Sequence, residues 1–417
     1  MVSKLSSGLR IGTACMVAAG WHLAMGGIAQ AQQPPAPPPP APTAEAPAAP
    51  GAPTPDAAAP ASTAMANPSM TGPLTANAKP MSFEAGDFGT IYVTGAISGL
   101  GLFQSDPGVA GVGDHADHVD LSNGQLIVQK TDGLVQFFAE VGAYSFPSLG
   151  TPYFQSGRAT GFYTPFSTGY IKLAPTDTFS VQAGKLPTLI GAEYAFTFQN
   201  MNIERGLLWN QEPVFSRGVQ GNYTAGPVAF SLSLNDGFYS GNYDWVSGSA
   251  AWTIDKVNTL SVVGGGNFDR TTRNTLATPL AQDNSKILNV IYTYNNAPWT
   301  ITPYFQYTSV DSNPTLGLPR AETWGGAILA NYQINDNVNV AGRAEYISSS
   351  GPGNLLYGPG SSAASFTITP TWQDGIYFMR GDASVVQAFS TTPGLVFGKF
   401  GNTRTQARWV LEGGIIF

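Results

Sequence analysis

The chain has 417 residues, of which only 11% are charged and 12% are aromatic, and its net charge is −7. Soluble domains carry about 25% charged residues, so this composition does not suit a solvated surface, and the negative balance argues against nucleic-acid binding. Beyond residue 31 no apolar run reaches the about 18 residues of a membrane-spanning helix. The single cysteine, Cys15, lies close to the N-terminus, which excludes disulfides and thiolate metal sites from the remainder.

The first 31 residues have the pattern of a secretory signal peptide. Lys4 and Arg10 precede an apolar stretch over 11–28, which ends at an Ala-Gln-Ala sequence. A basic region, an apolar region and an Ala-x-Ala site together mark a cleaved leader. An uncleaved anchor is the alternative, and the Ala-x-Ala site argues against it. We therefore assign 1–31 to the signal peptide.

Proline dominates the next segment, because residues 32–80 contain 15 of the 32 prolines of the chain. Proline removes backbone donors and fixes φ, so neither a helix nor a sheet is expected here. In a polyproline conformation the segment would reach on the order of 150 Å. We expect residues 32–88 to be a disordered periplasmic linker. It is either a tether to peptidoglycan or a passive spacer.

From residue 89 onward, apolar and polar residues alternate in runs separated by turn residues, which is typical of strands. The pattern predicts an all-β fold, a transmembrane antiparallel β-barrel of about 16 strands over 89–417. The expected strands are 90–103, 121–131, 134–145, 168–174, 178–185, 217–225, 227–236, 245–254, 258–268, 285–294, 298–310, 323–334, 337–349, 363–373, 376–388 and 403–417.

The connections between these strands alternate between short and long. Asp132-Gly133 and Asp374-Gly375 are examples of the short turns, and residues 146–167 and 186–216 are examples of the long loops. A soluble β-sandwich gives no reason for this alternation. Bacterial outer-membrane barrels do, since their short turns face the periplasm and their long loops face outward. An even strand number then places both ends of the barrel in the periplasm.

The last strand has one uncharged face, which carries Ala407, Trp409 and Leu411, and one largely polar face. Trp409 and the terminal Phe417 are separated by roughly 19 Å along the membrane normal, close to the apolar band of a barrel. This end resembles the closing strand of outer-membrane β-barrels. The resemblance implies that Phe417 is the assembly signal read by the barrel assembly machinery.

Turning the uncharged faces toward lipid points charged residues of both signs into the barrel. A lipid-facing Arg or Lys at the bilayer midplane costs about 2–4 kcal/mol, which favours this assignment. Sixteen strands leave room for an aqueous channel. These residues either line that channel or form structural ion pairs along the wall. The predicted pore-lining residues are Glu140, Lys172, Arg343, Glu345, Arg380, Asp382, Arg404, Arg408 and Glu412.

The longest loop, 186–216, is the candidate constriction loop, with Glu193, Asn202, Arg205 and Glu212 as its candidate residues. It either folds into the lumen or covers the outer mouth. The sequences GKLPTLIGAE at 184–193 and NIERGLLW at 202–209 resemble the β-barrel porin-2 family of Gram-negative bacteria. The resemblance spans 88–417, and Glu193, Asn202 and Arg205 match the family pattern. It implies an outer-membrane porin.

These observations favour a porin, a water-filled channel for the passive diffusion of small hydrophilic solutes. The alternative is a non-conducting structural or adhesive barrel tethered to the cell wall. We expect no enzyme activity, because the histidines beyond the leader, His115 and His118, both lie in the first long loop. We also expect no catalytic residue, no cofactor and no metal, although the sequence Asp-His-Ala-Asp-His at 114–118 contains donors for Zn²⁺ or Cu²⁺.

The same hypothesis predicts the partners of the chain. They are outer-membrane lipid and lipopolysaccharide, the barrel assembly machinery, small hydrophilic solutes and, through the linker, peptidoglycan. A homotrimer is a further option, because porins are often trimers. We expect no nucleic-acid partner and an integral location in the outer membrane of a Gram-negative cell.

Overall fold

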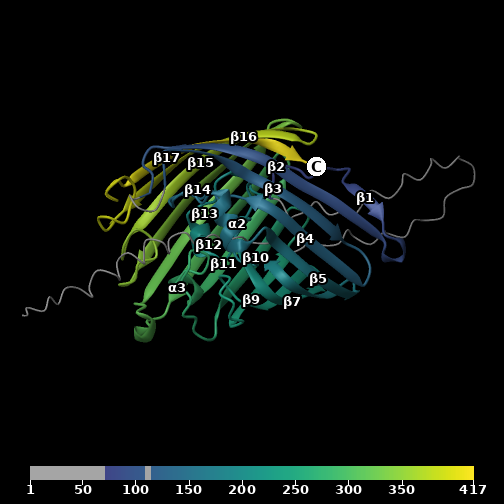
Figure 1. Ribbon diagram of the computed structural model, residues 1–417, viewed down its shortest axis with the longest axis horizontal. Helices are drawn as coiled ribbons and strands as arrows, with labels where there is room; N and C mark the ends of the chain where they lie inside the picture. The colour runs from purple at the N-terminus through teal and green to yellow at the C-terminus, as the bar shows by residue number, and fades with distance from the viewer. Residues whose placement is uncertain (1–70, 109–113) are drawn as a thin grey trace, which may run out of the picture.

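The structure is a computed structural model that describes residues 71–108 and 114–417. Sixteen antiparallel strands form a closed barrel in which the last strand pairs with the first, as Trp409 opposite Phe103 and Ile415 opposite Ile97 (Figure 1). The predicted barrel with its 16 strands is therefore confirmed. In the described part of the chain, no helix is long and apolar enough to cross a membrane.

The observed strands overlap the predicted ones at every position. They are β2 (Thr90–Gln104), β3 (Asp117–Lys130), β4 (Val135–Tyr144), β5 (Phe166–Thr176), β6 (Phe179–Pro187), β7 (Phe215–Ala225), β8 (Val228–Asn235), β9 (Trp245–Thr253), β10 (Asn258–Asn267), β11 (Ser285–Asn296), β12 (Trp299–Val310), β13 (Ala321–Gln333), β14 (Val338–Ser350), β15 (Ser362–Asp374), β16 (Tyr377–Phe389) and β17 (Thr405–Ile416). Each strand pairs with its neighbour in sequence, so the topology is a simple meander closed by β17 and β2.

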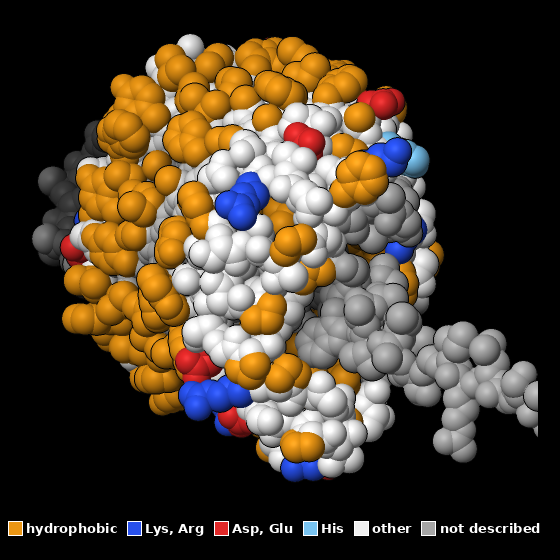
Figure 2. All heavy atoms as spheres, turned by 90° about the vertical axis from the view of Figure 1, so that its left-hand side faces the viewer, with side chains coloured by type: hydrophobic (Ala, Val, Ile, Leu, Met, Phe, Trp, Pro, Cys, Tyr) orange, Lys and Arg blue, Asp and Glu red, His pale blue; other side chains and the backbone are white. Residues whose placement is uncertain are grey.

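Alternation along the strands separates an apolar outer face from a polar inner face. In β8, Leu232 is 65% exposed and Leu234 is 48% exposed, whereas Ser233 between them is buried. In β17, Trp409 and Leu411 are exposed and the intervening Val410 is buried. Figure 2 looks onto the end that carries the long loops and shows apolar side chains along the outer circumference. This band is the surface expected to face lipid.

The described chain before the barrel differs from the expected linker. Residues 71–80 lie at the short-turn end of the barrel, where Thr75 and Gln373 exchange hydrogen bonds. They are followed by a short strand, β1 (Met81–Glu84), which pairs with the first residues of β2. The pairing is possible because β2 begins before the segment that β17 covers, leaving its Thr90–Val93 edge free for β1. The signal peptide over 1–31 and most of the linker, up to residue 70, lie outside the described residues.

Short helices interrupt four of the long loops. They are α2 (Ser156–Tyr163), η3 (Thr197–Gln199), η4 (Leu208–Gln211), α3 (Leu280–Asp283) and η5 (Pro314–Leu316). A further turn, η2 (Gly86–Phe88), precedes β2. The alternation pattern did not predict α2, whose sequence contains Gly157 and Gly161 and is a weak helix former.

The loops also place a hydrophobic core inside the barrel. Phe146 contacts Phe196 and Trp209 at ring-centroid distances of 6.3 Å and 6.2 Å, and all three side chains are buried. These residues come from the loop after β4 and the loop after β6. Part of the space that sixteen strands enclose is therefore filled by loop side chains rather than by water.

At the short-turn end, the C-terminal residue completes the pairing between the last and the first strand of the barrel. Phe417 and Gly95 exchange backbone hydrogen bonds of 2.9 Å and 3.0 Å. A Cβ atom at Gly95 would lie 2.6 Å from the Phe417 ring and 2.4 Å from the carbonyl oxygen of Gln125. Only glycine therefore allows β2, β3 and the terminal residue to approach this closely.

Candidate functional site

The loop between β6 and β7 lies inside the barrel. Gly191 N donates to Asn289 Oδ1 of β11 at 3.1 Å, Gln306 Nε2 of β12 donates to Leu208 O at 2.9 Å, and Asn202 Nδ2 donates to Thr369 Oγ1 of β15 at 2.6 Å. These partners are inward-facing residues of three separate strands. The sequence left open whether this loop folds into the lumen or covers the outer mouth, and in the structure it lies in the lumen.

Two ion pairs attach this loop to the barrel wall. Arg343 NH1 of β14 lies 2.6 Å from Glu193 Oε1, and Arg408 NH1 of β17 lies 3.0 Å from Glu204 Oε1. All four side chains are almost completely buried. Breaking such a buried pair from one side typically costs about 3–5 kcal/mol, because it leaves an uncompensated charge. The pairs therefore hold the loop against β14 and β17.

A third pair lies within the wall and also binds the loop. Arg380 NH2 of β16 lies 2.8 Å from Glu412 Oε2 of β17. The same guanidinium donates to the carbonyl oxygens of Thr197 at 2.6 Å and Asn200 at 2.9 Å. Thr197 Oγ1 in turn donates to Glu412 Oε1 at 2.5 Å. Wall and loop thus share one hydrogen-bond network around η3.

Wall carboxylates satisfy backbone amides of the loop. Asp382 Oδ2 accepts from Glu204 N at 2.8 Å, and Glu345 Oε2 accepts from Leu207 N at 3.0 Å. A buried amide without a partner would cost about 1–3 kcal/mol. The irregular backbone at 204–207 is therefore stable at this depth because the wall supplies acceptors.

Glu212 is an exception among the buried carboxylates. In the described structure neither of its oxygens has a hydrogen-bond partner. Burial raises the pKa of Glu212 well above its ordinary value, and the nearby carboxylates of Glu193 and Glu345 raise it further. Its carboxyl packs against Gly191, where a Cβ would lie 1.9 Å from Oε2 and where φ is +89°. A side chain at residue 191 would therefore displace Glu212.

Arg205 is also buried in the loop, and its position is set by aromatic rings. Its guanidinium carbon lies 5.0 Å from the centroid of Trp209 and 5.9 Å from that of Phe146. Its NH1 donates to Ile203 O at 3.2 Å. Cation–π contacts of this kind stabilise a desolvated guanidinium. Arg205 therefore stabilises the packing of the loop.

The structure separates the nine predicted pore-lining residues into groups. The six residues on β14, β16 and β17 point inward, are between 1% and 5% exposed, and are covered by the loop. Glu140 on β4 is also buried, Lys172 on β5 is half-buried, and Arg404 is exposed just before β17. Of these nine residues, Lys172 borders the large cavity described next.

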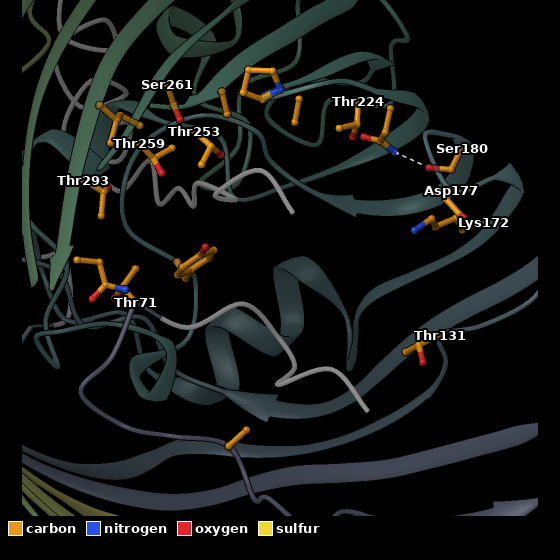
Figure 3. A pocket seen from close by; sticks show the side chains of 18 of the residues that line it. Thr71, Thr131, Lys172, Asp177, Ser180, Thr224, Thr253, Thr259, Ser261 and Thr293 are labelled. Carbon is orange, nitrogen blue, oxygen red and sulfur yellow. Dashed lines mark hydrogen bonds between the residues drawn. The ribbon is translucent and has the colours of Figure 1, made fainter. Parts of the chain in front are cut away.

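That cavity, which we call the vestibule, has a volume of about 2260 Å³ and lies at the short-turn end. Gly191, Ala192, Tyr194 and Met201 of the loop border it on one side. Hydroxyl and amide side chains of β6–β12 border it on the other, as Figure 3 shows. These wall residues are Ser180, Asn222, Thr224, Thr253, Thr259, Ser261, Thr293, Thr300 and Thr302.

The wall residues of the vestibule are not among the predicted pore-lining residues, because that prediction rests on inward charges. The charged residues of β6–β12 are Lys185, Arg217 and Lys286. All three lie on the outward face of their strands. Lys185 and Arg217 are cross-strand partners on the same face as the exposed Val219, and Lys286 lies on the same face as the exposed Leu288. The alternation that predicted the strands could have found the threonines and serines, since they occupy the inward positions of the same strands.

The segment before β1 enters the vestibule and contacts the loop. Thr71 N donates to Gln199 O at 2.8 Å, and Leu74 is buried. Thr75 N donates to Gln373 Oε1 at 2.8 Å, and Gln373 Nε2 donates to Thr75 O at 2.9 Å. We call residues 71–80 the N-terminal strap. The strap joins the short-turn end of β15 to the lumen loop.

Of the two histidines expected in the first long loop, His118 is instead the second residue of β3, because that strand begins earlier than predicted. Its Nε2 lies 3.1 Å from Asp114 Oδ1 of the loop. His118 also lies against Tyr153, with ring centroids 4.7 Å apart. No group of three potential metal ligands occurs in the described residues. His118 therefore packs between the start of β3 and the loop residues Asp114 and Tyr153.

A family comparison identifies the class of protein. Residues 90–417 match the family described as Putative beta-barrel porin-2, OmpL-like. The match covers more than half of the chain, so the chain belongs to this family. None of the curated protein sequences matches the chain.

Solved structures show the same fold at low sequence identity. OmpT expressed in the outer membrane of Vibrio cholerae is 12% identical with a TM-score of 0.53, over 81% of this chain and 100% of that chain. The anion-selective porin from Comamonas acidovorans is 10% identical with a TM-score of 0.53, over 78% and 99% of the two chains. A trimer form of Vibrio cholerae OmpT is 11% identical with a TM-score of 0.53, over 78% and 99%. The protein is a porin-like channel, integral to the outer membrane.

Proposed function

We propose that the protein conducts small hydrophilic solutes passively, along the uncharged polar wall of β6–β12. The observation that carries the proposal is the vestibule of about 2260 Å³ between that wall and the lumen loop. Threonine, serine and asparagine side chains exchange hydrogen bonds with water and with polar solutes without holding an ion tightly. The loop narrows the barrel on the side of the vestibule that faces the long-loop end. The proposal assigns transport to the protein and no catalysis.

The experiment is single-channel recording from purified, folded protein in planar bilayers. We expect discrete, voltage-independent conductance steps, and reduced steps when neutral sugars of increasing size are added. Protein that has been boiled before addition is the control for non-specific leaks. Folded protein that inserts but gives no steps would contradict the proposal.

One observation favours the alternative, a non-conducting structural barrel. At the level of the three ion pairs the inward charges are covered, and aromatic side chains of two loops fill the adjoining space. A barrel closed in this way would give no steps in the same recording. Envelope integrity rather than solute uptake would then depend on the protein.

The remaining partners follow from the outer-membrane location. We propose that Phe417 is read by the barrel assembly machinery, that peptidoglycan binds the proline-rich linker, and that lipid and lipopolysaccharide surround the apolar band. The trimer form of Vibrio cholerae OmpT supports a homotrimer here. Mass measurement in detergent tests the homotrimer, and a Phe417 deletion tests the assembly signal.

A further inference from the structure

A groove on the outer wall, at the long-loop end of β5–β8, has features of a second binding site. Its volume is about 660 Å³. It opens outward, because the apolar residues that line it belong to the exposed band. Val219 is 50% exposed, Leu234 is 48% exposed and Phe166 is 46% exposed. Gly169, Gly184 and Gly218 also line it, so backbone forms part of its floor.

Two cationic side chains lie side by side at the end of this groove that is nearer the long loops, which we call its upper end. Lys185 of β6 and Arg217 of β7 are direct cross-strand neighbours. The ammonium of Lys185 donates to Phe166 O at 2.9 Å and to Tyr163 O. Within the described residues, no carboxylate lies at salt-bridge distance from Lys185, although seven other lysine and arginine side chains have such a partner.

The ring of Tyr239 contacts both cations. Lys185 Nζ is 4.8 Å from its centroid, and the guanidinium carbon of Arg217 is 4.1 Å from it. Asp236 holds Arg217 at 2.7 Å, so one carboxylate faces two positive charges. The side chain of Arg217 remains 36% exposed. The upper end of the groove therefore has a net positive charge.

The lower part of the groove is apolar and continues into the band that faces lipid. A cation at the edge of the hydrocarbon region is stabilised by an anion at the same depth. A phosphate group at the upper end would take charge-assisted hydrogen bonds from Lys185 and Arg217, while the attached acyl chains would lie against Val219 and Leu234.

We propose that this groove binds a phosphorylated lipid of the outer leaflet, with its phosphate between Lys185 and Arg217. Charge complementarity selects this occupant over a second copy of the chain. The proposal depends on the outer-membrane location and goes beyond conduction, because Lys185 and Arg217 lie on the outer face. Lys286 provides the contrast, since this rim cation already pairs with Asp311 at 2.7 Å.

The test measures phosphorylated lipid that remains bound to protein purified from outer membranes, by native mass spectrometry. The variants are Lys185→Met, which removes the unpaired cation, and Val219→Trp, which fills the groove and leaves both cations in place. Lys286→Met is the matched cation control. Ile328→Trp on β13, 55% exposed, is the matched apolar control. Heat-modifiable migration on gels selects folded protein.

We expect Lys185→Met to lose bound lipid by about tenfold, because one charge-assisted hydrogen bond contributes about a decade of affinity. Val219→Trp should lose lipid to a similar extent, because its ring fills the groove. The two controls should retain it. After the bound lipid has been removed from the wild type, added phosphorylated lipid A should bind again, whereas dephosphorylated lipid A and inorganic phosphate should not. Conductance of Lys185→Met should match the wild type, which separates this proposal from the channel proposal.

Three results would overturn it. If the groove variants keep their lipid, the groove is not the site at which the lipid binds. Equal loss from Lys286→Met would show non-specific attraction to any rim cation. A Val219→Trp variant with normal lipid but an altered number of chains per particle would make the groove a contact between copies.

Discussion

Two halves of the barrel wall carry different kinds of inward side chain. On β14–β17 the inward positions include six charged residues that the loop covers, and the most exposed of them is 5% exposed. On β6–β12 the inward positions carry hydroxyl and amide groups, and these border the vestibule. The loop fills the space beside the charged half, whereas the vestibule lies beside the uncharged half.

The difference shows what each kind of residue does in a barrel. Buried charges require partners, and the loop supplies Glu193 and Glu204 to the arginines of the wall. Hydroxyl groups make hydrogen bonds to water as readily as to protein, so they leave a wall that a solute can pass. The sequence left open whether the inward charges line the channel or form structural ion pairs. Those of β14, β16 and β17 contact the loop and hold it in position.

The largest effect is expected from breaking a loop anchor. Arg343→Met leaves Glu193 and Glu345 buried without their cation, at a cost of about 3–5 kcal/mol. We expect the loop to leave the wall, with a larger and noisier single-channel conductance and earlier loss of heat-modifiable migration.

Lys286→Met is the control for Arg343→Met, because its pair with Asp311 is exposed at both side chains. It should behave as the wild type. Equal effects of the two substitutions would mean that the buried pair does not anchor the loop.

The next largest effect should come from placing a charge in the uncharged half. Thr259→Glu introduces a carboxylate at the vestibule wall, and we expect the cation-to-anion permeability ratio to rise by about two- to threefold at low salt. Reversal potentials in a salt gradient measure the ratio. Thr259→Ser should leave it unchanged, and an unchanged ratio in Thr259→Glu would place the path elsewhere.

A smaller effect is expected from releasing the N-terminal strap. Gln373→Leu removes three hydrogen bonds to Thr75, each of which contributes about 1 kcal/mol or less at this exposed site. The strap should then leave the vestibule more often, and brief higher-conductance openings should become more frequent. Gln136→Leu, which lines the same vestibule but bonds to Gly133 O, is the matched control. Similar records from both variants would show that the strap does not restrict the path.

Much of the fold could be predicted from the sequence, because strands and turns are local patterns. The alternation around Leu232 and Ser233 and the Asp-Gly turn at 132–133 each specify a neighbourhood of a few residues. The loop position could not be predicted in this way. It depends on pairs such as Arg343 with Glu193 and Arg408 with Glu204, whose members lie 150 and 204 residues apart.

The smallest expected effect concerns pH. The pKa of Glu212 is raised by burial above its ordinary value of 4.5, so its contribution to stability is full below that value and is lost as pH rises toward the raised pKa. We expect the loop of the wild type to loosen gradually with rising pH, seen as increasing current noise. Glu212→Gln cannot ionise and should show a flatter pH profile. Identical profiles would mean that Glu212 ionises freely in place.

The central claim is that solutes pass the uncharged half of the wall, and thiol modification tests it most directly. Ser261→Cys lies at the vestibule, whereas Ser384→Cys lies on the charged half, where Ser384 Oγ donates to Glu204 Oε2 at 3.0 Å. With Cys15 replaced, each variant carries one thiol. A charged methanethiosulfonate reagent should reduce single-channel current through Ser261→Cys and leave Ser384→Cys unchanged. Block of Ser384→Cys, with none of Ser261→Cys, would contradict the account.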